Sequence, residues 1–230
     1  MSREELAREN ARLRGDLLTI AHRISHDLRT PLGGVIAASE ALKEILADNE
    51  AAALVDSILG STDEICKLIK RTSFITKASA SPVAKEAVAM GLVVGGVLQQ
   101  LESRSLKARA TIIEPASWPK VNGVAAWLDA VWWNLLANAL QHAGEAPKIE
   151  LGWCVEERNF RFFVSDSGGG VAENKRAKLF QSFDSLHGSA SPHGLGLSFV
   201  RRLVELQGGV CGYESNPSGG ACFFFILPAA

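Results

Sequence analysis

The chain of 230 residues has little cysteine, and what it has is scattered. No two of the four cysteines form a CxxC pair, so a metal site is not expected and reduced thiols in a cytosolic protein are the simplest interpretation. The cysteines are Cys66, Cys154, Cys211 and Cys222. The sequence also shows no signal-peptide pattern and no apolar run long enough to span a bilayer. We therefore expect a cytoplasmic protein without a membrane segment in this chain.

An excess of charge is absent as well. The formal net charge is -1 at pH 7 and the isoelectric point is about 6.5, which is poor electrostatics for a general nucleic-acid binder. Hydrophobic residues make up 47% of the chain, which is enough for a packed core and too much for a disordered chain. At roughly 100–200 residues per domain, the length allows one or two domains.

What the N-terminal part does have is a heptad pattern over residues 3–24. Its positions alternate by spacings of four and three, and one of them is an asparagine. They are Leu6, Asn10, Leu13, Leu17, Ile20 and Ile24. Two interpretations remain open: a parallel coiled-coil dimer, which an asparagine at an a position favours, or one amphipathic helix that packs on its own domain.

The helical pattern continues through residues 33–46, is interrupted at Asp48 and Asn49, and resumes in a second helix. The second helix carries an apolar stripe made of Leu54, Ile58, Ile65, Leu68, Ile69 and Ile75. Two long helices with a short connection form an antiparallel hairpin. Because one hairpin cannot bury a wide apolar face alone, residues 1–80 are predicted to form half of a dimeric four-helix bundle.

The pattern changes after residues 77–87, a stretch of small residues with one proline that we interpret as a linker or boundary. Beyond it, β-like runs alternate with helical runs. The β-like runs are 110–114, 148–155, 159–166 and 222–228, and the helical runs are 89–104, 124–143 and 195–207. This alternation predicts a two-layer α/β sandwich over residues 81–230, so the expected fold class of the whole chain is α+β.

One predicted helix of this second domain carries a row of polar side chains. In "NLLANALQHAG", Asn134, Asn138 and His142 are spaced by four residues and share one face. The core-facing side is made of Leu128, Val131, Leu135 and Ala139. Buried amides need hydrogen-bond partners, so the row indicates either a ligand-binding face or a helix with one wet side.

Two glycine motifs follow. "VSDSGGGV" places Asp166 at the end of a predicted strand, where its carboxylate can accept a hydrogen bond from an exocyclic amine. The glycines after it allow close approach of a ligand to the backbone, and an ordinary turn is the plainer alternative. "HGLGLSFVRRL" opens a helix with Gly194 and Gly196, and the free N–H groups of a helix start suit a phosphate. The long segment between the two motifs has little periodicity, which is typical of a lid.

Together these motifs resemble the ATP-binding domain of the sensor histidine kinases, within the gyrase, Hsp90 and MutL ATPase superfamily. Their order is an asparagine-rich helix, DxGxG, the paired Phe180 and Phe183 of "KLFQSF", and GLGL. Upstream, "SHDLRTPL" resembles the H-box of the same kinases, where a dimerising helical hairpin carries the phosphorylated histidine. The resemblance runs from about residue 15 to residue 228 and implies a two-component kinase that uses ATP and Mg²⁺.

In the H-box, the resemblance makes His26 the phosphorylated residue, because a neutral imidazole nitrogen can attack the γ-phosphorus of ATP in line. Asp27 would orient the ring or take its proton. Thr30 would help to orient water for dephosphorylation of the partner, and Pro31 would bend the helix just beyond the site. The implied partners are a second copy of the chain and the receiver domain of a response regulator.

In the second domain, the resemblance makes Asn138 the Mg²⁺ ligand and Asp166 the reader of the adenine amino group. Gly168 and Gly170 would lie beneath the base, and Phe180 would pack the lid. The full ATP-binding set is Asn134, Asn138, His142, Asp166, Gly168, Gly170, Phe180, Gly194, Leu195 and Gly196. Lys175, Arg176 and Lys178 are further candidates for a phosphate contact.

Two positions depart from the family pattern. Pro192 stands at the lid hinge where the family usually has glycine, and proline removes an N–H. Gln141 replaces a basic residue before the histidine that ends the asparagine-rich motif. We therefore expect a slow kinase with ordinary affinity for adenine. The alternative is a phosphotransfer or adaptor protein of the same fold that does not use ATP.

Overall fold

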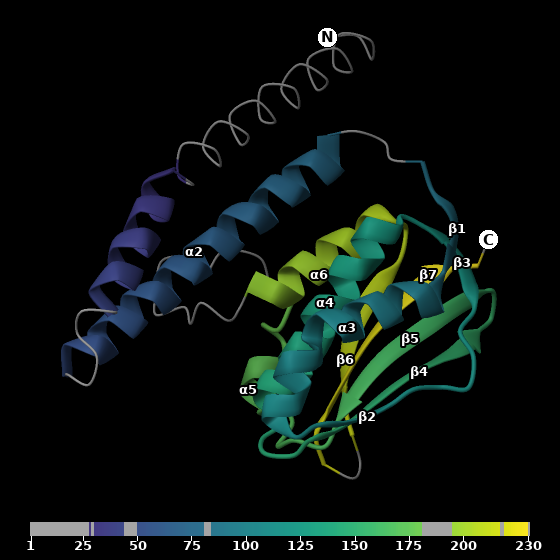
Figure 1. Ribbon diagram of the computed structural model, residues 1–230. Helices are drawn as coiled ribbons and strands as arrows, with labels where there is room; N and C mark the ends of the chain where they lie inside the picture. Colours follow the sequence, from purple (N-terminus) through teal and green to yellow (C-terminus); the bar gives the residue numbers. More distant parts are fainter. Residues whose placement is uncertain are drawn as a thin grey trace, which may run out of the picture. The chain divides into compact units, whose positions relative to one another are not determined.

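The computed structural model describes residue 28 and residues 30–43, 50–80, 84–180, 195–216 and 219–229. The chain divides into two compact units, Met1–Pro82 and Val83–Ala230, which are coloured from purple to blue and from blue to yellow in Figure 1. The heptad pattern of residues 3–24 and the interruption at Asp48 and Asn49 lie outside the described residues.

The described part of the first unit contains two helices, residues 30–43 and α2 (Glu50–Ala80). Lys43 at the end of the first helix forms an ion pair with Asp56 in the second turn of α2, with 2.7 Å between Nζ and Oδ1. A contact between the end of one helix and the start of the next is what the predicted antiparallel hairpin requires.

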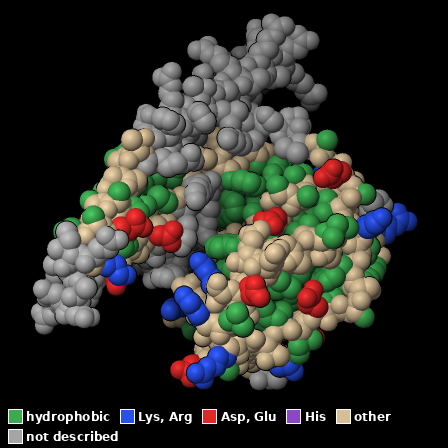
Figure 2. All heavy atoms as spheres, in the orientation of Figure 1, with side chains coloured by type: hydrophobic (Ala, Val, Ile, Leu, Met, Phe, Trp, Pro, Cys, Tyr) green, Lys and Arg blue, Asp and Glu red, His purple; other side chains and the backbone are tan. Residues whose placement is uncertain are grey.

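Apolar side chains lie along the surface of this hairpin, where Figure 2 draws them in green. The exposed set is Leu28, Val35, Leu42, Leu54, Ile58 and Ile65. Leu54, Ile58 and Ile65 belong to the stripe that the sequence pattern identifies, and Leu54 is 68% exposed. Ile69 of the same stripe is buried. Of the four stripe residues whose side chains the structure describes, three therefore face solvent within one chain.

The second unit is a two-layer α/β sandwich, as the sequence pattern predicts (Figure 1). Its strands are β1 (Glu86–Ala89), β2 (Thr111–Ile113), β3 (Lys120–Gly123), β4 (Lys148–Glu156), β5 (Asn159–Asp166), β6 (Val210–Ser215) and β7 (Ala221–Pro228). Its helices are α3 (Met90–Ala108), α4 (Ala125–His142), α5 (Glu173–Arg176) and α6 (Leu195–Leu206).

Five of these strands form one sheet in the order β2-β4-β5-β7-β6. The β2–β4 pair is parallel, and the other three pairs are antiparallel. β1 and β3 form a separate antiparallel pair. Helices α3, α4 and α6 lie together over one face of the large sheet (Figure 1).

The core is built by inward-facing side chains of the central strands. Phe162 of β5 and Phe225 of β7 are fully buried, and their ring centroids are 5.1 Å apart. Trp132 of α4 is also fully buried, with centroids 6.2 Å from Phe162 and 5.4 Å from Phe225. Its Nε1 donates to Met90 Sδ at 3.1 Å, so the indole has a partner despite its burial. These contacts fix α4 against β5.

A buried glutamine joins three parts of this unit. Gln207, just past the end of α6, is 0% exposed. Its Oε1 accepts a hydrogen bond from the N–H of Val124 at 2.9 Å, and its Nε2 donates to the carbonyl of Leu203 at 3.1 Å. Its own carbonyl accepts from Lys85 Nζ at 2.6 Å. The first residues of the unit, the start of α4 and the end of α6 are thereby fixed to one another.

The two units divide between Pro82 and Val83, inside the stretch of residues 77–87 that the sequence predicts as a linker or boundary, but both ends of this stretch belong to regular structure. Residues 77–80 are the last turn of α2, and Glu86 already begins β1. Alanines and serines are compatible with a helix, so residues 77–80 can continue α2. β1 is extended because it pairs with β3, which is a tertiary interaction. The sequence pattern predicts neither of these two strands, nor β6 or α5.

Candidate functional site

The polar row of α4 runs from the interior of the second unit to its surface. Asn134 is 5% exposed, and its Nδ2 donates to the carbonyl of Ala130 at 2.7 Å. Asn138 is half-buried, and His142, the last residue of α4, is exposed. Leu128, Val131, Leu135 and Ala139, which flank the row, are all buried, which confirms the expected core-facing side of the helix. The row therefore offers one amide and one imidazole near solvent.

Asp166 ends β5 and is 6% exposed. Its Oδ1 accepts two backbone hydrogen bonds, from Gly168 N at 2.9 Å and from Ala221 N at 3.2 Å. Among the described residues, none donates to Oδ2. Two fixed N–H groups hold the carboxylate plane in one orientation. The second oxygen is therefore a fixed acceptor that a ligand amine could use.

The glycines after Asp166 permit the backbone to pack closely on itself. A Cβ at Gly168 would lie 2.6 Å from Ala143 Cα, where α4 ends. Gly170 has φ +69, and a Cβ there would lie 2.8 Å from the carbonyl oxygen of Gly220. A Cβ at Gly220 would in turn overlap the carbonyl oxygen of Asp166. The close approach that the motif predicts is thus made to the chain's own backbone, which brings the ends of α4, β5 and the β6–β7 turn together.

The second glycine motif opens α6. The helix begins at Leu195, Gly196 is buried within its first turn, and Gly194 lies outside the described residues. α6 ends as the sequence predicts: Gly208 has φ +80 and its N–H bonds to the carbonyl of Glu205, while the N–H of Gly209 bonds to that of Val204. A helix of 12 residues directs its free N–H groups and the positive end of its dipole beyond Leu195.

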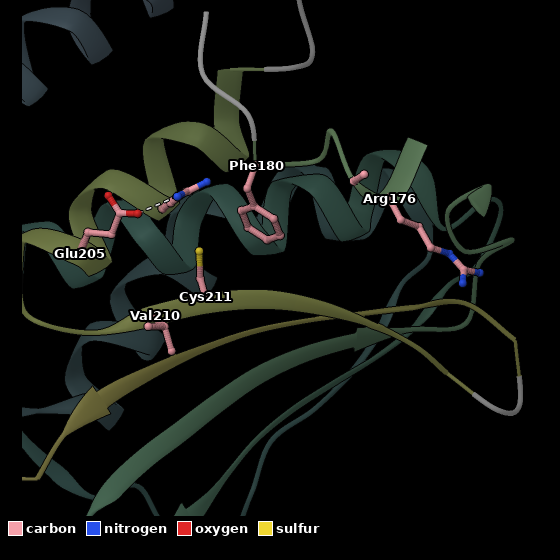
Figure 3. Close-up of a pocket in the computed structure, with 7 residues that line it drawn as sticks. Arg176, Phe180, Glu205, Val210 and Cys211 are labelled. Carbon is pink, nitrogen blue, oxygen red and sulfur yellow. Dashed lines mark hydrogen bonds and ion pairs between the residues drawn. The ribbon is translucent and has the colours of Figure 1, made fainter. Parts of the chain in front are cut away.

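Phe180 is half-buried, and its ring meets that of Phe223 edge to face at a centroid distance of 6.3 Å. Beside it lies a cavity of about 360 Å³, lined by Arg176, Ala177, Phe180, Arg201, Glu205, Val210 and Cys211 (Figure 3). Burial raises the pKa of the Cys211 thiol to about 12, so this sulfur is protonated and unreactive at neutral pH. None of the lining residues is Asp166 or a member of the α4 row, so this cavity is not the candidate site. Phe183 and Pro192 lie outside the described residues.

The three basic residues considered for a phosphate contact, at positions 175, 176 and 178, differ in their contacts. Arg176 donates from Nε to the carbonyl of Val171 at 3.0 Å, and its guanidinium lies 5.7 Å from the ring centroid of Tyr213. Lys175 and Lys178 are exposed. Arg176 thus has a role within the protein fold, whereas the structure does not distinguish the two lysines as phosphate contacts.

The β6–β7 hairpin contributes residues that sequence reasoning misses. Ala221 provides the second N–H on Asp166, Asn216 Nδ2 donates to Ser165 Oγ at 3.2 Å, and Tyr213 bonds to the loop after Gly170. The signal that could have found them is the turn composition of "SNPSGG", which predicts a hairpin that brings β6 and β7 next to each other. Nothing in the sequence indicates that this hairpin lies against Asp166.

In the first unit, Thr30 is exposed on its helix. Pro31 lies inside the helix of residues 30–43. His26 and Asp27 lie outside the described residues, so their predicted roles rest on the sequence.

The described residues contain no group of three or more His, Cys, Asp or Glu side chains that could hold a metal ion. Asn138 is the hard oxygen donor on the α4 face, and one amide oxygen fits Mg²⁺, which keeps several waters and phosphate oxygens as its other ligands. As for membranes, none of the helices in the described part of the chain combines the length and the apolar character needed to cross a bilayer.

Two family models match the chain, one in each unit. Residues 16–80 match the His Kinase A (phospho-acceptor) domain. Residues 123–230 match the histidine kinase-, DNA gyrase B-, and HSP90-like ATPase. Together they account for most of the chain and occur in the order that the motifs predict.

Curated relatives and a solved structure agree with these matches. The chain is 29% identical over 211 residues to the methanogenesis regulatory histidine kinase FilI of Methanothrix harundinacea, covering 89% of this chain and 24% of the relative. It is 30% identical over 232 residues to the sensor protein KdpD of Escherichia coli, covering 97% of this chain and 25% of the relative. The chain thus spans about a quarter of the length of these relatives. The crystal structure of full-length ShkA in complex with AMPPNP has a TM-score of 0.67 and 25% identity, covering 92% of this chain and 46% of that chain.

Proposed function

Because the chain belongs to the histidine kinases, with a phosphoacceptor domain followed by an ATPase domain, we propose that it phosphorylates its own His26 from ATP and passes the phosphoryl group to an aspartate of a response regulator. In this proposal residues 1–80 form the dimerisation and phosphotransfer hairpin, and residues 81–230 form the catalytic ATP-binding domain. The complex of ShkA with AMPPNP, an ATP analogue, supports nucleotide binding in a protein of the same fold.

The observation that carries the proposal is the carboxylate of Asp166. Both hydrogen bonds that it accepts within the described residues go to Oδ1, so Oδ2 can accept one from an exocyclic amine. An adenine base presents such an amine, and a carboxylate that is already held in place loses little freedom on binding it. In this geometry Asp166 would read the base, and the packed glycines at 168 and 170 would form the floor beneath it.

The phosphates would extend from the base towards α6. The free N–H groups around Gly194, Leu195 and Gly196 and the dipole of α6 would attract them, with Asn134 and His142 on the same side. Mg²⁺, held by the amide oxygen of Asn138, would neutralise part of the phosphate charge during transfer. Phe180 would anchor the start of the lid through its contact with Phe223, 6.3 Å between centroids.

The transfer itself would take place on the hairpin. A nitrogen of the neutral His26 imidazole attacks the γ-phosphorus, and the bond from that phosphorus to the bridging oxygen of ADP breaks as the N–P bond forms. Asp27 would hold the ring and accept its proton. Thr30, exposed on the helix of residues 30–43, would orient the water that later dephosphorylates the response regulator.

The exposed apolar stripe of the hairpin supports a homodimer. Leu54, Ile58 and Ile65 face solvent in the single chain, and a contiguous exposed apolar surface marks an interaction site. Two hairpins that bury these stripes against each other would form a four-helix bundle. We further propose the receiver domain of a response regulator as the second partner and the cytoplasm, where ATP is available, as the location.

The test is incubation of the purified chain with labelled ATP and Mg²⁺, followed by a search for acid-labile, base-stable label. His26→Ala should abolish the label but leave nucleotide binding unchanged, because the two functions lie in different units. Asp166→Asn keeps an oxygen for Gly168 N and Ala221 N but turns a donor towards the adenine amine. We expect it to fold normally and to bind ATP about 10- to 100-fold more weakly, since a hydrogen bond to a charged group is worth about 1.5–3 kcal/mol.

Asp129→Asn is a matched control, because it makes the same change at a different carboxylate, which lies on α4 and is not part of the site. It should bind ATP like the parent chain. If the parent chain shows no nucleotide binding by calorimetry at millimolar ATP, the kinase proposal is wrong and a relay without ATP is the better reading. Label that persists in His26→Ala would contradict the choice of acceptor.

A further inference from the structure

Val171, the residue that follows the three glycines at 168–170, forms hydrogen bonds through both its N–H and its carbonyl. The N–H of Val171 donates to Tyr213 Oη at 3.2 Å, and the carbonyl of Val171 accepts from Arg176 Nε at 3.0 Å. The two side chains also meet each other, because the Arg176 guanidinium lies 5.7 Å from the Tyr213 ring centroid, within the range of a cation–π interaction. Val171, Tyr213 and Arg176 thus form a closed set of three contacts, which we call the Val171 clamp.

Tyr213 is well placed to hold this position. Its ring packs on Phe223 at a centroid distance of 5.4 Å, and its hydroxyl lies 3.4 Å from Ser215 Oγ. The hydroxyl can therefore donate to Ser215 while it accepts from Val171. Tyr213 belongs to β6, which pairs with β7 along its whole length. A regular strand, rather than a loop, thus supplies the fixed point of the clamp.

The clamp lies at the far end of the segment whose near end orients Asp166. Gly168 N bonds to Asp166 Oδ1 at 2.9 Å, and Gly170 adopts φ +69 between these two points. Three successive glycines have the largest conformational freedom of any tripeptide, so this segment would lose its shape without a restraint at both ends. A displacement of Val171 would therefore also displace the N–H of Gly168, which bonds to the Asp166 carboxylate.

We propose that Tyr213 and Arg176 are positioning residues for the nucleotide, because their clamp on Val171 keeps the glycine segment in the shape in which Asp166 faces the base. This inference rests on the proposed function and adds two residues that touch neither base nor phosphate. The clamp orders the segment before the nucleotide arrives, so that binding does not have to order it. Its contribution belongs to affinity and not to the chemical step.

The test uses the full chain with Tyr213→Phe, which removes the hydroxyl but keeps the ring against Phe223 and Arg176. Hydrogen exchange of a peptide that contains Val171, measured without nucleotide, should become faster. The dissociation constant for ADP should rise about fivefold, the effect of one lost hydrogen bond, while the autophosphorylation rate at saturating ATP stays unchanged. Arg176→Met should act in the same direction.

Arg104→Met is the matched control for Arg176→Met. Arg104 belongs to α3 and also lies over an aromatic ring, with its guanidinium 5.4 Å from the ring centroid of Trp133. It should leave ADP affinity unchanged. If the parent chain binds ADP and Tyr213→Phe binds it equally well with unchanged exchange at Val171, the clamp has no positioning role although the kinase proposal stands. If the parent chain binds no nucleotide, both proposals are overturned. Lower thermal stability with unaltered ADP affinity would show a purely structural contact and would also overturn this inference.

Discussion

Replacement of Gln207 by methionine gives a quantitative test of the second unit. Methionine has a similar length and flexibility, so Gln207→Met opens little cavity in a site that is 0% exposed. The change removes the acceptor of the Val124 N–H, now 2.9 Å from Oε1, and the donor to the Leu203 carbonyl. The backbone contact from Lys85 to the carbonyl of residue 207 remains available.

The expected cost follows chiefly from the Val124 N–H, because a buried N–H without an acceptor costs about 1–3 kcal/mol. The Leu203 carbonyl also loses the Gln207 Nε2 donor, but a carbonyl with an unused lone pair is tolerated better than an unpaired N–H. We therefore expect Gln207→Met to lower the free energy of unfolding of the second unit by about 2 kcal/mol. For a domain of roughly 150 residues this is a fall in the melting temperature of about 4–8 °C.

Tryptophan fluorescence measures this unit alone, even in the full chain. All five tryptophans lie in it: Trp118, Trp127, Trp132, Trp133 and Trp153. Thermal or urea unfolding followed at the tryptophan emission therefore excludes the hairpin from the signal. Gln99→Met, an exposed glutamine of α3, is the matched control and should change stability by less than about 0.5 kcal/mol. A Gln207→Met protein as stable as this control would refute the reasoning, since the Val124 N–H would then not depend on the glutamine.

Two further predictions concern reactivity and rate. Burial raises the pKa of the Cys211 thiol to about 12, so the folded protein keeps it protonated until far above pH 8; iodoacetamide at pH 8 should alkylate the exposed Cys154 well before Cys211, and mass spectrometry showing equal rates would contradict this account. Pro192→Gly restores an N–H at the predicted lid hinge and should raise the autophosphorylation rate more than it changes ADP affinity; an unchanged or lower rate would mean that the proline is neutral or helpful.

The parts of the fold that the sequence predicts are those with a strong local pattern. α4 combines a continuous apolar face with spaced polar residues, and β5 and β7 are rich in phenylalanine and β-branched residues. The strands that escape prediction lack a run of β-branched or aromatic residues, as in "EAVA" of β1, "KVNG" of β3 and "VCGYES" of β6. Such segments become extended because a neighbour pairs with them, and no local pattern encodes the neighbour.

In the candidate site, too, the sequence predicts some features and misses others. The position of Asp166 at the end of a strand follows from the alternation of β5 and from the glycines after it. Its second N–H donor, Ala221, lies 55 residues further along the chain and reaches the carboxylate through the pairing of β5 with β7. Tyr213 likewise lies 42 residues along the chain from Val171, whose N–H it holds. Contacts of this kind depend on register across the sheet, which the sequence alone does not give.

The packing of α3 determines where ATPase modules of this kind could be exchanged between proteins. The region that matches other ATPases begins at residue 123, after α3. Yet α3 contributes four side chains at most 1% exposed to the core: Met90, Val94, Val97 and Leu101. At roughly 1.5–3 kcal/mol for each buried apolar side chain, their loss would consume the 5–15 kcal/mol that holds a typical domain folded. A chimera joined at residue 123 would also lose β1 and all but the last residue of β3, so a joint between Pro82 and Lys85 is the one that transfers a whole folding unit.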